Sequence, residues 1–299
     1  MSFSKQSDHN AFAVPTSAPQ WFIDNLQHPG ESVVAPVAGG DIHFLAWNWE
    51  QPDLPTLLFV HGFAGHARWW SYLAPFFTDQ YRVLAMDLPG MGDNTARSSY
   101  DDHCFAQAII DVIRHYDLQQ VTIVGHSFGG IQTIRALAMA PELFQHGIVV
   151  DSNVRLPPAD KIRFIDGRES HARRPSQAAC VERFRLTPPQ PVADETLLRF
   201  IGFHSCSEDE QGWFWKFDPK LRNYAEINDA SLLETVTTKV DCIYGEHSMF
   251  SADNLPARVL ACFPNRGKLI MIPGAYHHLM VDQPLPFVDA LKTLLNTKN

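Results

Sequence analysis

Residues 121–130 read Val-Thr-Ile-Val-Gly-His-Ser-Phe-Gly-Gly, and the fold follows from this stretch. Its first four residues are apolar or β-branched, which predicts a buried strand. After Gly130, apolar side chains recur at Ile131, Ile134 and Leu137 up to Pro141, the spacing of one helix face and a residue that ends a helix. A strand therefore runs through a Gly-x-Ser-x-Gly turn into a helix.

The turn places Ser127 at the start of the predicted helix, where backbone N–H groups favour negative charge. Side chains two residues before and after this serine would collide in so sharp a turn, and Gly125 and Gly129 stand there. This pattern is typical of a nucleophilic serine. The alternative is a glycine-rich turn in which Ser127 only caps the helix.

Strands and helices alternate on both sides of this unit. Helical spacing of apolar residues predicts helices at 21–27, 104–116, 127–139 and 284–295. Most of the predicted strands are nearly continuous apolar runs, as expected for strands buried on both faces. We therefore expect an α/β fold with a mainly parallel sheet of eight strands flanked by helices. The predicted strands are 32–37, 42–49, 56–60, 81–86, 121–124, 147–150, 240–244 and 268–272.

Composition excludes several classes of protein. The 299 residues are 45% hydrophobic and 19% charged, which excludes disorder for most of the chain. A net charge of −9 lacks the basic character of a nucleic-acid binder, and no apolar run approaches the ~18 residues of a membrane span. Residues 1–20 contain no apolar signal segment, and the five cysteines form no C-x-x-C pair, so we expect a cytoplasmic protein.

The alternation stops over residues 152–237, which we call the cap segment. It has no evident buried strand, and we expect a helical cap inserted after the sixth strand, with residues 1–20 as a flexible tail and residues 21–151 and 238–299 as the core. Residues 155–185 carry eight basic and four acidic side chains, a local charge of +4. Either this is a solvated surface or the cap attracts anionic substrates.

The chain resembles the enzymes of the α/β-hydrolase fold from about Trp21 to the C-terminus. The resemblance rests on the Gly125–Gly130 turn and on three further loops that each follow a predicted strand. These loops are His-Gly-Phe at 61–63, Asp-Leu-Pro-Gly-Met-Gly at 87–92 and Pro-Gly-Ala-Tyr-His at 273–277.

The resemblance implies a role for several of these residues. His277 matches the family's catalytic histidine, seven residues before Pro284, and His278 is adjacent but out of register. The backbone N–H groups of Phe63 and Phe128 match the two donors of the oxyanion hole. We expect His61 to shape the oxyanion loop and His126 to pack beside the turn. His204 and Cys206 lack a third metal ligand, so no metal is predicted.

The acidic partner of the histidine departs from the common pattern. Family members usually carry an aspartate at the position where this chain has Ser248. Other branches take the acid from the end of the sixth strand, and Asp151 lies there, 24 residues after Ser127. We expect Asp151 to be the acid, with Glu246 as the alternative.

The sequence therefore predicts a serine hydrolase that cleaves carboxylic esters of small molecules through an acyl-enzyme, with the catalytic residues Ser127, His277 and Asp151 and no cofactor. Haloalkane dehalogenases and epoxide hydrolases resemble this fold but use an aspartate as the nucleophile. Three alternatives remain open: a thioesterase, a carbon–carbon bond hydrolase with the same residues, and a non-catalytic ligand-binding protein of this fold.

Overall fold

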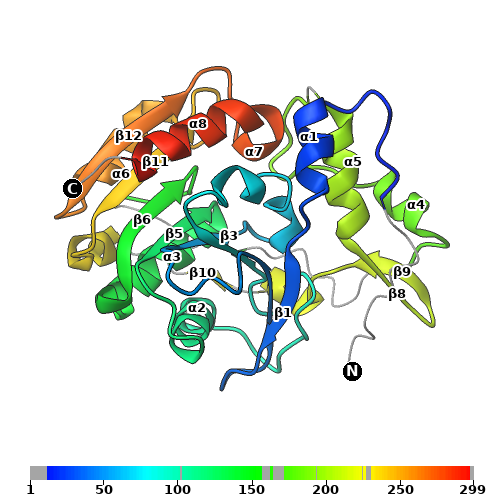
Figure 1. The fold of residues 1–299 in the computed structure, drawn as a ribbon, viewed down its shortest axis with the longest axis horizontal. Helices are drawn as coiled ribbons and strands as arrows, with labels where there is room; N and C mark the ends of the chain where they lie inside the picture. Colours follow the sequence, from blue (N-terminus) through cyan, green and yellow to red (C-terminus); the bar gives the residue numbers. More distant parts are fainter. Residues whose placement is uncertain are drawn as a thin grey trace.

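All eight predicted strands pair in one sheet, whose strand order is β1-β2-β4-β3-β5-β6-β11-β12 (Figure 1). The computed structural model describes residues 12–101, 103–156, 162–163, 172–192, 194–223, 225–226 and 230–296. The strands of this sheet are β1 (Glu31–Ala35), β2 (Ile42–Trp47), β3 (Thr56–Val60), β4 (Arg82–Met86), β5 (Val121–His126), β6 (Phe144–Val150), β11 (Val240–Gly245) and β12 (Arg266–Ile272).

The sheet is mainly parallel. Strands β1, β2 and β4 pair antiparallel at one edge, and every pairing from β4 through β3, β5, β6 and β11 to β12 is parallel. Strands β2 to β5 and β11 are buried along their whole length, which explains their continuous apolar sequences. The predicted fold class is confirmed.

Helices cover both faces of the sheet (Figure 1). Along β3, Leu58 packs into the core that contains α2 and α3, whereas Leu57 and Phe59 pack into the core that contains α1 and α8. This alternation follows from the two-residue period of a strand. The α-helices are α1 (Gln20–Leu26), α2 (Cys104–His115), α3 (Phe128–Met139), α4 (Gln177–Val181), α5 (Glu195–His204), α6 (Leu255–Ala261), α7 (Leu279–Asp282) and α8 (Pro284–Leu295).

The cap segment lies between β6 and β11 in the sequence and contains α4 and α5. It also contains a ribbon of two short antiparallel strands, β8 (Cys206–Asp209) and β9 (Gly212–Trp215), beside α4 and α5 (Figure 1). A second pair joins β7 (Ile162–Arg163) to β10 (Ala225–Glu226). The sequence did not predict these ribbons, because each strand has at most four residues and β8 is mostly exposed.

The cap segment is fastened to the loop that follows β4. The backbone N–H of Gly92 donates to the carbonyl of Lys216, and the N–H of Asp218 donates to the carbonyl of Gly90. The ammonium group of Lys216 also forms an ion pair with Asp93 at 2.5 Å. These contacts hold this part of the cap segment against the core.

The predicted tail covers residues 1–20, of which 1–11 lie outside the described residues. Among the others, the ring of Phe12 packs edge-on against Phe200 of α5, with 5.4 Å between the ring centroids, a contact that was not expected from the sequence. Within the described residues, no helix has the length and apolar character needed to cross a membrane.

The sheet order brings four loops together at one edge. Strands β3, β5, β6 and β11 are neighbours and parallel, so their carboxyl ends lie side by side. They end at Val60, His126, Val150 and Gly245, close in the chain to Phe63, Ser127, Asp151 and Ser248. In open α/β sheets this edge is where ligands bind.

Candidate active site

Ser127 occupies a strained turn between β5 and α3. Its backbone has φ 54° and ψ −118°, a conformation that a residue with a side chain rarely adopts and that costs roughly 1–3 kcal/mol. A Cβ atom on Gly125 would lie 2.4 Å from the carbonyl oxygen of Gly129, which explains the glycine before the serine. The predicted strand–turn–helix unit is confirmed.

From the sequence, a side chain at position 129 was expected to collide within the turn itself. The structure shows a collision with a neighbouring loop instead. A Cβ atom there would lie 2.4 Å from the carbonyl oxygen of His61, at the end of the neighbouring strand β3. The first turn of α3 therefore packs directly against the loop after β3. This close approach brings the backbone around Phe63 beside Ser127.

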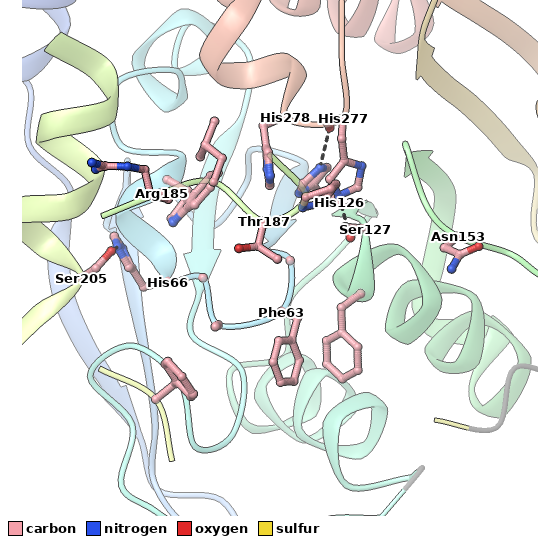
Figure 2. Close-up of a pocket in the computed structure, with 18 of the residues that line it drawn as sticks. Phe63, His66, His126, Ser127, Asn153, Arg185, Thr187, Ser205, His277 and His278 are labelled. Carbon is pink, nitrogen blue, oxygen red and sulfur yellow. Dashed lines mark hydrogen bonds between the residues drawn. The ribbon is translucent and has the colours of Figure 1, made fainter. Parts of the chain in front are cut away.

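Ser127, His277 and Asp151 lie in one hydrogen-bonded line. Nε2 of His277 is 3.0 Å from Oγ of Ser127, and Nδ1 of His277 is 2.8 Å from Oδ1 of Asp151. Figure 2 shows the ring of His277 directed at Ser127 from the loop after β12. The structure thus brings together three residues that are 126 and 150 positions apart in the sequence.

Asp151 reaches His277 from the end of β6. Its backbone has φ 42°, and its N–H donates to the carbonyl of Ile243 in β11. The carboxylate accepts two further hydrogen bonds, from the N–H of Gly245 at 2.7 Å and from the hydroxyl of Ser248 at 2.5 Å. These donors fix the orientation of the carboxylate toward His277.

Glu246, the alternative acid, lies elsewhere. Its carboxylate is exposed and accepts a hydrogen bond from the N–H of Gly274 at 2.9 Å. The described contacts of His277 include Asp151 and not Glu246. The geometry therefore supports the first choice for the acid.

Burial sets the protonation of this line of residues. Desolvation lowers the pKa of His277 to about 3, so the free imidazole is neutral at pH 7 and can accept a proton. Desolvation also raises the pKa of Asp151 to about 7, although the hydrogen bonds from Gly245 and Ser248 oppose this rise. Burial thus opposes charge on both groups, and the hydrogen bonds from Gly245 and Ser248 favour the carboxylate form of Asp151.

The neighbouring histidines have structural contacts. His61 donates from Nδ1 to the carbonyl of Gly62 and accepts the N–H of Leu88 at Nε2, so it braces the loop after β3. Nε2 of His126 donates to the carbonyl of His277 at 2.9 Å. His278 stacks near Trp69 instead of reaching Ser127, with 5.4 Å between the ring centroids. These positions agree with the roles expected for His61 and His126.

Phe63 and Phe128 lie on opposite sides of Ser127 along the chain but touch each other. Their rings meet edge to face with 5.7 Å between centroids, and both residues line the cavity at Ser127; Figure 2 labels Phe63 there. Phe128 is the first residue of α3, and Phe63 follows β3. Both residues therefore lie beside Ser127 in the cavity.

The cavity above Ser127 has a volume of about 820 Å³, within the usual range for small-molecule sites. The loops of the core form one wall. The cap segment forms much of the other with residues whose place beside the serine no local pattern predicts, because only folding brings them there. They include Arg185, Thr187, Ser205, Trp215 and Lys216.

Two groups of side chains have metal-ligand spacing within the described residues. In each group, His126, His277 and His278 or His43, Asp87 and Asp93, the ligand atoms lie within 4.8 Å of one another. A cation in the first group would compete with Ser127 and Asp151 for His277. The pair set aside from the sequence, His204 and Cys206, belongs to neither group.

The fold and this site define a class of protein, and comparison with known sequences agrees with it. A sequence model of the alpha/beta hydrolase family matches residues 57–290. The chain therefore belongs to the alpha/beta hydrolase family.

Individual relatives carry several hydrolase names. A Haemophilus influenzae protein, provisionally named an esterase/lipase, is 26% identical over 247 residues, covering 82% of this chain and 84% of that protein. Human epoxide hydrolase 4 is 30% identical over 254 residues, 77% of this chain and 69% of its own. The structure of E-2-(acetamidomethylene)succinate hydrolase superposes with a TM-score of 0.75 at 18% identity, covering 90% of this chain and 100% of the other, which shows a shared fold.

Proposed function

We propose that this protein is a serine hydrolase that cleaves carboxylic esters through an acyl-enzyme, with Ser127 as nucleophile, His277 as base and Asp151 as the acid that orients His277. The observation that carries the proposal is the line from Oγ of Ser127 through His277 to Asp151, with contacts of 3.0 and 2.8 Å. A serine hydroxyl is a weak nucleophile at neutral pH, and this arrangement supplies the base that it needs.

In the first half-reaction, Oγ of Ser127 attacks the ester carbonyl carbon while its proton moves to Nε2 of His277. The imidazolium that forms is stabilised by Asp151, and the negative oxygen of the tetrahedral intermediate accepts hydrogen bonds from the backbone N–H groups of Phe63 and Phe128. One such donor lowers the barrier by about 3–4 kcal/mol. His277 then gives its proton to the departing alcohol, which leaves Ser127 acylated.

In the second half-reaction, a water molecule takes the place of the alcohol. His277 accepts a proton from this water, whose oxygen attacks the acyl carbon. The second tetrahedral intermediate collapses as His277 returns the proton to Oγ of Ser127, and the carboxylic acid is released. Each proton taken up by His277 is returned, so neither a metal nor a redox cofactor is needed for this sequence.

The nucleophile separates this proposal from the chemistry named for one relative. Epoxide hydrolases of this fold carry an aspartate at the nucleophile position, whereas this chain has Ser127. A serine ester intermediate suits an acyl substrate. We therefore propose ester hydrolysis and not epoxide opening, despite the 30% identity to human epoxide hydrolase 4.

We further propose that residues 152–237 act as a cap that shapes the substrate cavity. Trp215 and Arg185 of this segment line the cavity, and the hydrogen bonds from Gly92 to Lys216 and from Asp218 to Gly90 attach the segment to the core. The cytoplasmic location remains a proposal from the sequence. All five cysteines are free thiols, which is compatible with a reducing compartment.

The test combines turnover with covalent labelling. Purified protein is assayed with p-nitrophenyl esters of two to sixteen carbons and with one thioester, and labelled with a fluorophosphonate. We expect ester turnover and labelling, both abolished in Ser127→Ala with an unchanged melting temperature. Labelling without turnover would favour a ligand-binding protein. Turnover that persists at a tenth of the wild-type rate in Ser127→Ala would exclude Ser127 as the nucleophile.

A further inference from the structure

We propose that the active-site cavity takes esters that carry a carboxylate, and that Arg183 and Arg185 at its mouth bind this carboxylate. The inference rests on the proposed function and names the substrate class of the same site. It starts from the charge of the cavity. The charged side chains among its described lining residues are all basic, namely Arg155, Arg183, Arg185 and Lys216.

Some of these basic side chains already form an ion pair with a carboxylate of the protein, and others do not. Lys216 forms an ion pair with Asp93 at 2.5 Å. Elsewhere in the cap segment, Arg173 pairs with Asp209. Arg183 and Arg185 form no ion pair with any carboxylate in the described part of the chain. Two uncompensated positive charges thus stand at the entrance to the serine.

The guanidinium group of Arg185 is held in place by backbone atoms. Its Nη1 donates to the carbonyl oxygens of Glu182 and Phe184, at 2.8 and 2.7 Å. Within the described residues these bonds leave the edge formed by Nε and Nη2 without a hydrogen-bond partner. This edge is one of the two on a guanidinium that bind a carboxylate through two parallel hydrogen bonds.

The position of Arg185 indicates which part of a substrate it would meet. In Figure 2, Arg185 lies with His66 and Ser205 at one end of the view, Asn153 lies at the other, and Ser127 lies between them. The cavity that Arg185 and Ser127 both line also contains apolar side chains, among them Leu186 and Phe63. A carboxylate bound at Arg185 would therefore be separated from the scissile carbonyl by an apolar spacer.

The charge of the whole molecule strengthens this preference. The chain has a net charge of −9, so an anion is repelled by most of the surface. A basic mouth in an acidic protein concentrates anions at that mouth. Because the arginines are exposed, each ion pair is expected to be weak and to depend on salt.

Matched charged and neutral esters test this proposal. The first series has the charge on the acyl group: mono-p-nitrophenyl esters of glutaric, adipic and suberic acid, each beside its methyl-capped neutral counterpart. The second has it on the leaving group: 4-acetoxybenzoate beside its methyl ester. In at least one of the two series, we expect the charged ester to have a higher kcat/KM than its neutral counterpart at low salt. This difference should decrease as the salt concentration is raised. Equal kcat/KM for charged and neutral members in both series would overturn the proposal.

Variants identify the residues that are responsible. Arg183→Gln and Arg185→Gln should each lower the charged-to-neutral ratio of kcat/KM about three- to fivefold, and the double variant about tenfold, through KM. Arg199→Gln is the matched control. It removes the same charge from α5, where Arg199 pairs with Glu195 and does not line the cavity. A ratio that falls equally in Arg199→Gln would attribute the preference to net charge and exclude the site.

A binding measurement separates this inference from the proposed function. Ser127→Ala is titrated with adipate monomethyl ester and with dimethyl adipate, and tryptophan fluorescence is followed, because Trp69 and Trp215 line the cavity. We expect the charged ester to bind more tightly, and Arg185→Gln in this background to remove the difference. This result would support the anion site even if wild-type protein hydrolysed no ester. Equal binding of the two esters would overturn the inference while leaving ester hydrolysis intact.

Discussion

The hydroxyl of Ser248 donates a hydrogen bond to Oδ1 of Asp151, the same oxygen that accepts the Nδ1–H of His277. The family resemblance places Ser248 where related enzymes usually carry the acid. The position that the resemblance implies and the proposed acid, Asp151, are therefore in direct contact, at 2.5 Å. Because β6 and β11 are neighbouring strands, a carboxylate from the end of either can reach the same histidine.

This relationship makes the identity of the acid testable. Asp151→Asn retains the shape of the side chain but favours the wrong tautomer of His277, and we expect kcat to fall by up to roughly ten-thousandfold. Glu246→Gln should change kcat little, because its carboxylate contacts Gly274. Rates and melting temperatures are measured on the same preparations. An active Asp151→Asn with a lower melting temperature would make Asp151 a structural residue only.

A second substitution tests whether the acid can move. Ser248→Asp places a carboxylate at the more usual position, and in the Asp151→Asn background we expect partial recovery of kcat. The same change should not restore activity to Ser127→Ala, which lacks the nucleophile. If Ser248→Asp recovers nothing while the double variant folds normally, the contact between the two positions does not allow them to exchange roles.

Ser248 also tunes the acid that it contacts. Its hydrogen bond favours the charged form of Asp151, so Ser248→Ala should raise the pKa of this carboxyl group further above its usual value. Activity needs the carboxylate, which is lost as the pH falls through this raised pKa. We expect the acid limb of kcat/KM to move up by about one pH unit.

The control for this change is Ser251→Ala. Ser251 lies in the same loop but donates to the carbonyl of Gly245 instead of the carboxylate. The acid limb of kcat/KM in Ser251→Ala should match that of the wild type. A limb that does not move in Ser248→Ala, with only a lower melting temperature, would restrict Ser248 to holding the loop.

The sequence was sufficient for much of this fold because the relevant signals are local. The strand predicted at 121–124 extends from Val121 to His126, and Ser127, His277 and Asp151 all meet in space. Each of them directly follows a strand or lies in the loop after one. In a parallel sheet this placement alone brings residues to one edge.

The remaining features depend on how distant segments pair. The contact between Ser248 and Asp151 requires the register of β6 against β11, where Val150 pairs with Ile243. No local pattern encodes that register. The charge count predicted a basic cap segment but not which arginines reach the cavity, because Arg173 and Arg185 differ only in their spatial neighbours.

Stability should depend on pH because several histidines are buried in the neutral form. Burial lowers their pKa values below 6.5, so the unfolded chain binds more protons than the folded one as the pH falls below 6.5. Each therefore destabilises the folded protein as the pH falls below 6.5. The histidines concerned are His61, His66, His126, His277 and His278.

Three groups act in the opposite direction. The raised pKa values of Asp151, Asp282 and His43 make the folded protein bind protons more readily than the unfolded chain. The larger number of histidines should prevail, so the melting temperature is expected to fall between pH 7.5 and pH 5.5. Calorimetry in buffers of matched ionic strength measures this change. A constant or rising melting temperature would show that these histidines are not held neutral.

A second hydrogen-bonded series of serine, histidine and aspartate lies at strands β1, β2 and β4, on the antiparallel side of the sheet. Oγ of Ser32 lies 2.9 Å from Nε2 of His43, and Nδ1 of His43 lies 2.6 Å from Oδ2 of Asp87. These distances match those at Ser127, so the arrangement invites the same chemical interpretation. The series Ser32–His43–Asp87 can therefore be compared, within the same protein, with Ser127–His277–Asp151.

The two histidines differ in the property that catalysis needs. Burial lowers the pKa of His43, but the hydrogen bond to Asp87 and the charge of that carboxylate outweigh it, so His43 holds a second proton to higher pH than His277 does. His277 has a lowered pKa and can accept the proton of Ser127. Ser32 also lies in strand β1 and not among the described residues that line the cavity.

We therefore expect Ser32→Ala to retain kcat/KM within about twofold and to be labelled by a fluorophosphonate as fully as the wild type. Asp87→Asn should instead reduce stability, by about 3–5 kcal/mol, because its carboxylate is the buried partner of His43 and accepts the N–H groups of Ala67 and Asp93. Peptide mapping of the labelled protein should find the probe on Ser127. Probe attached to Ser32 in the Ser127→Ala variant would mean that the second series is also reactive, and that a strained turn and a cavity are not what distinguishes the nucleophile.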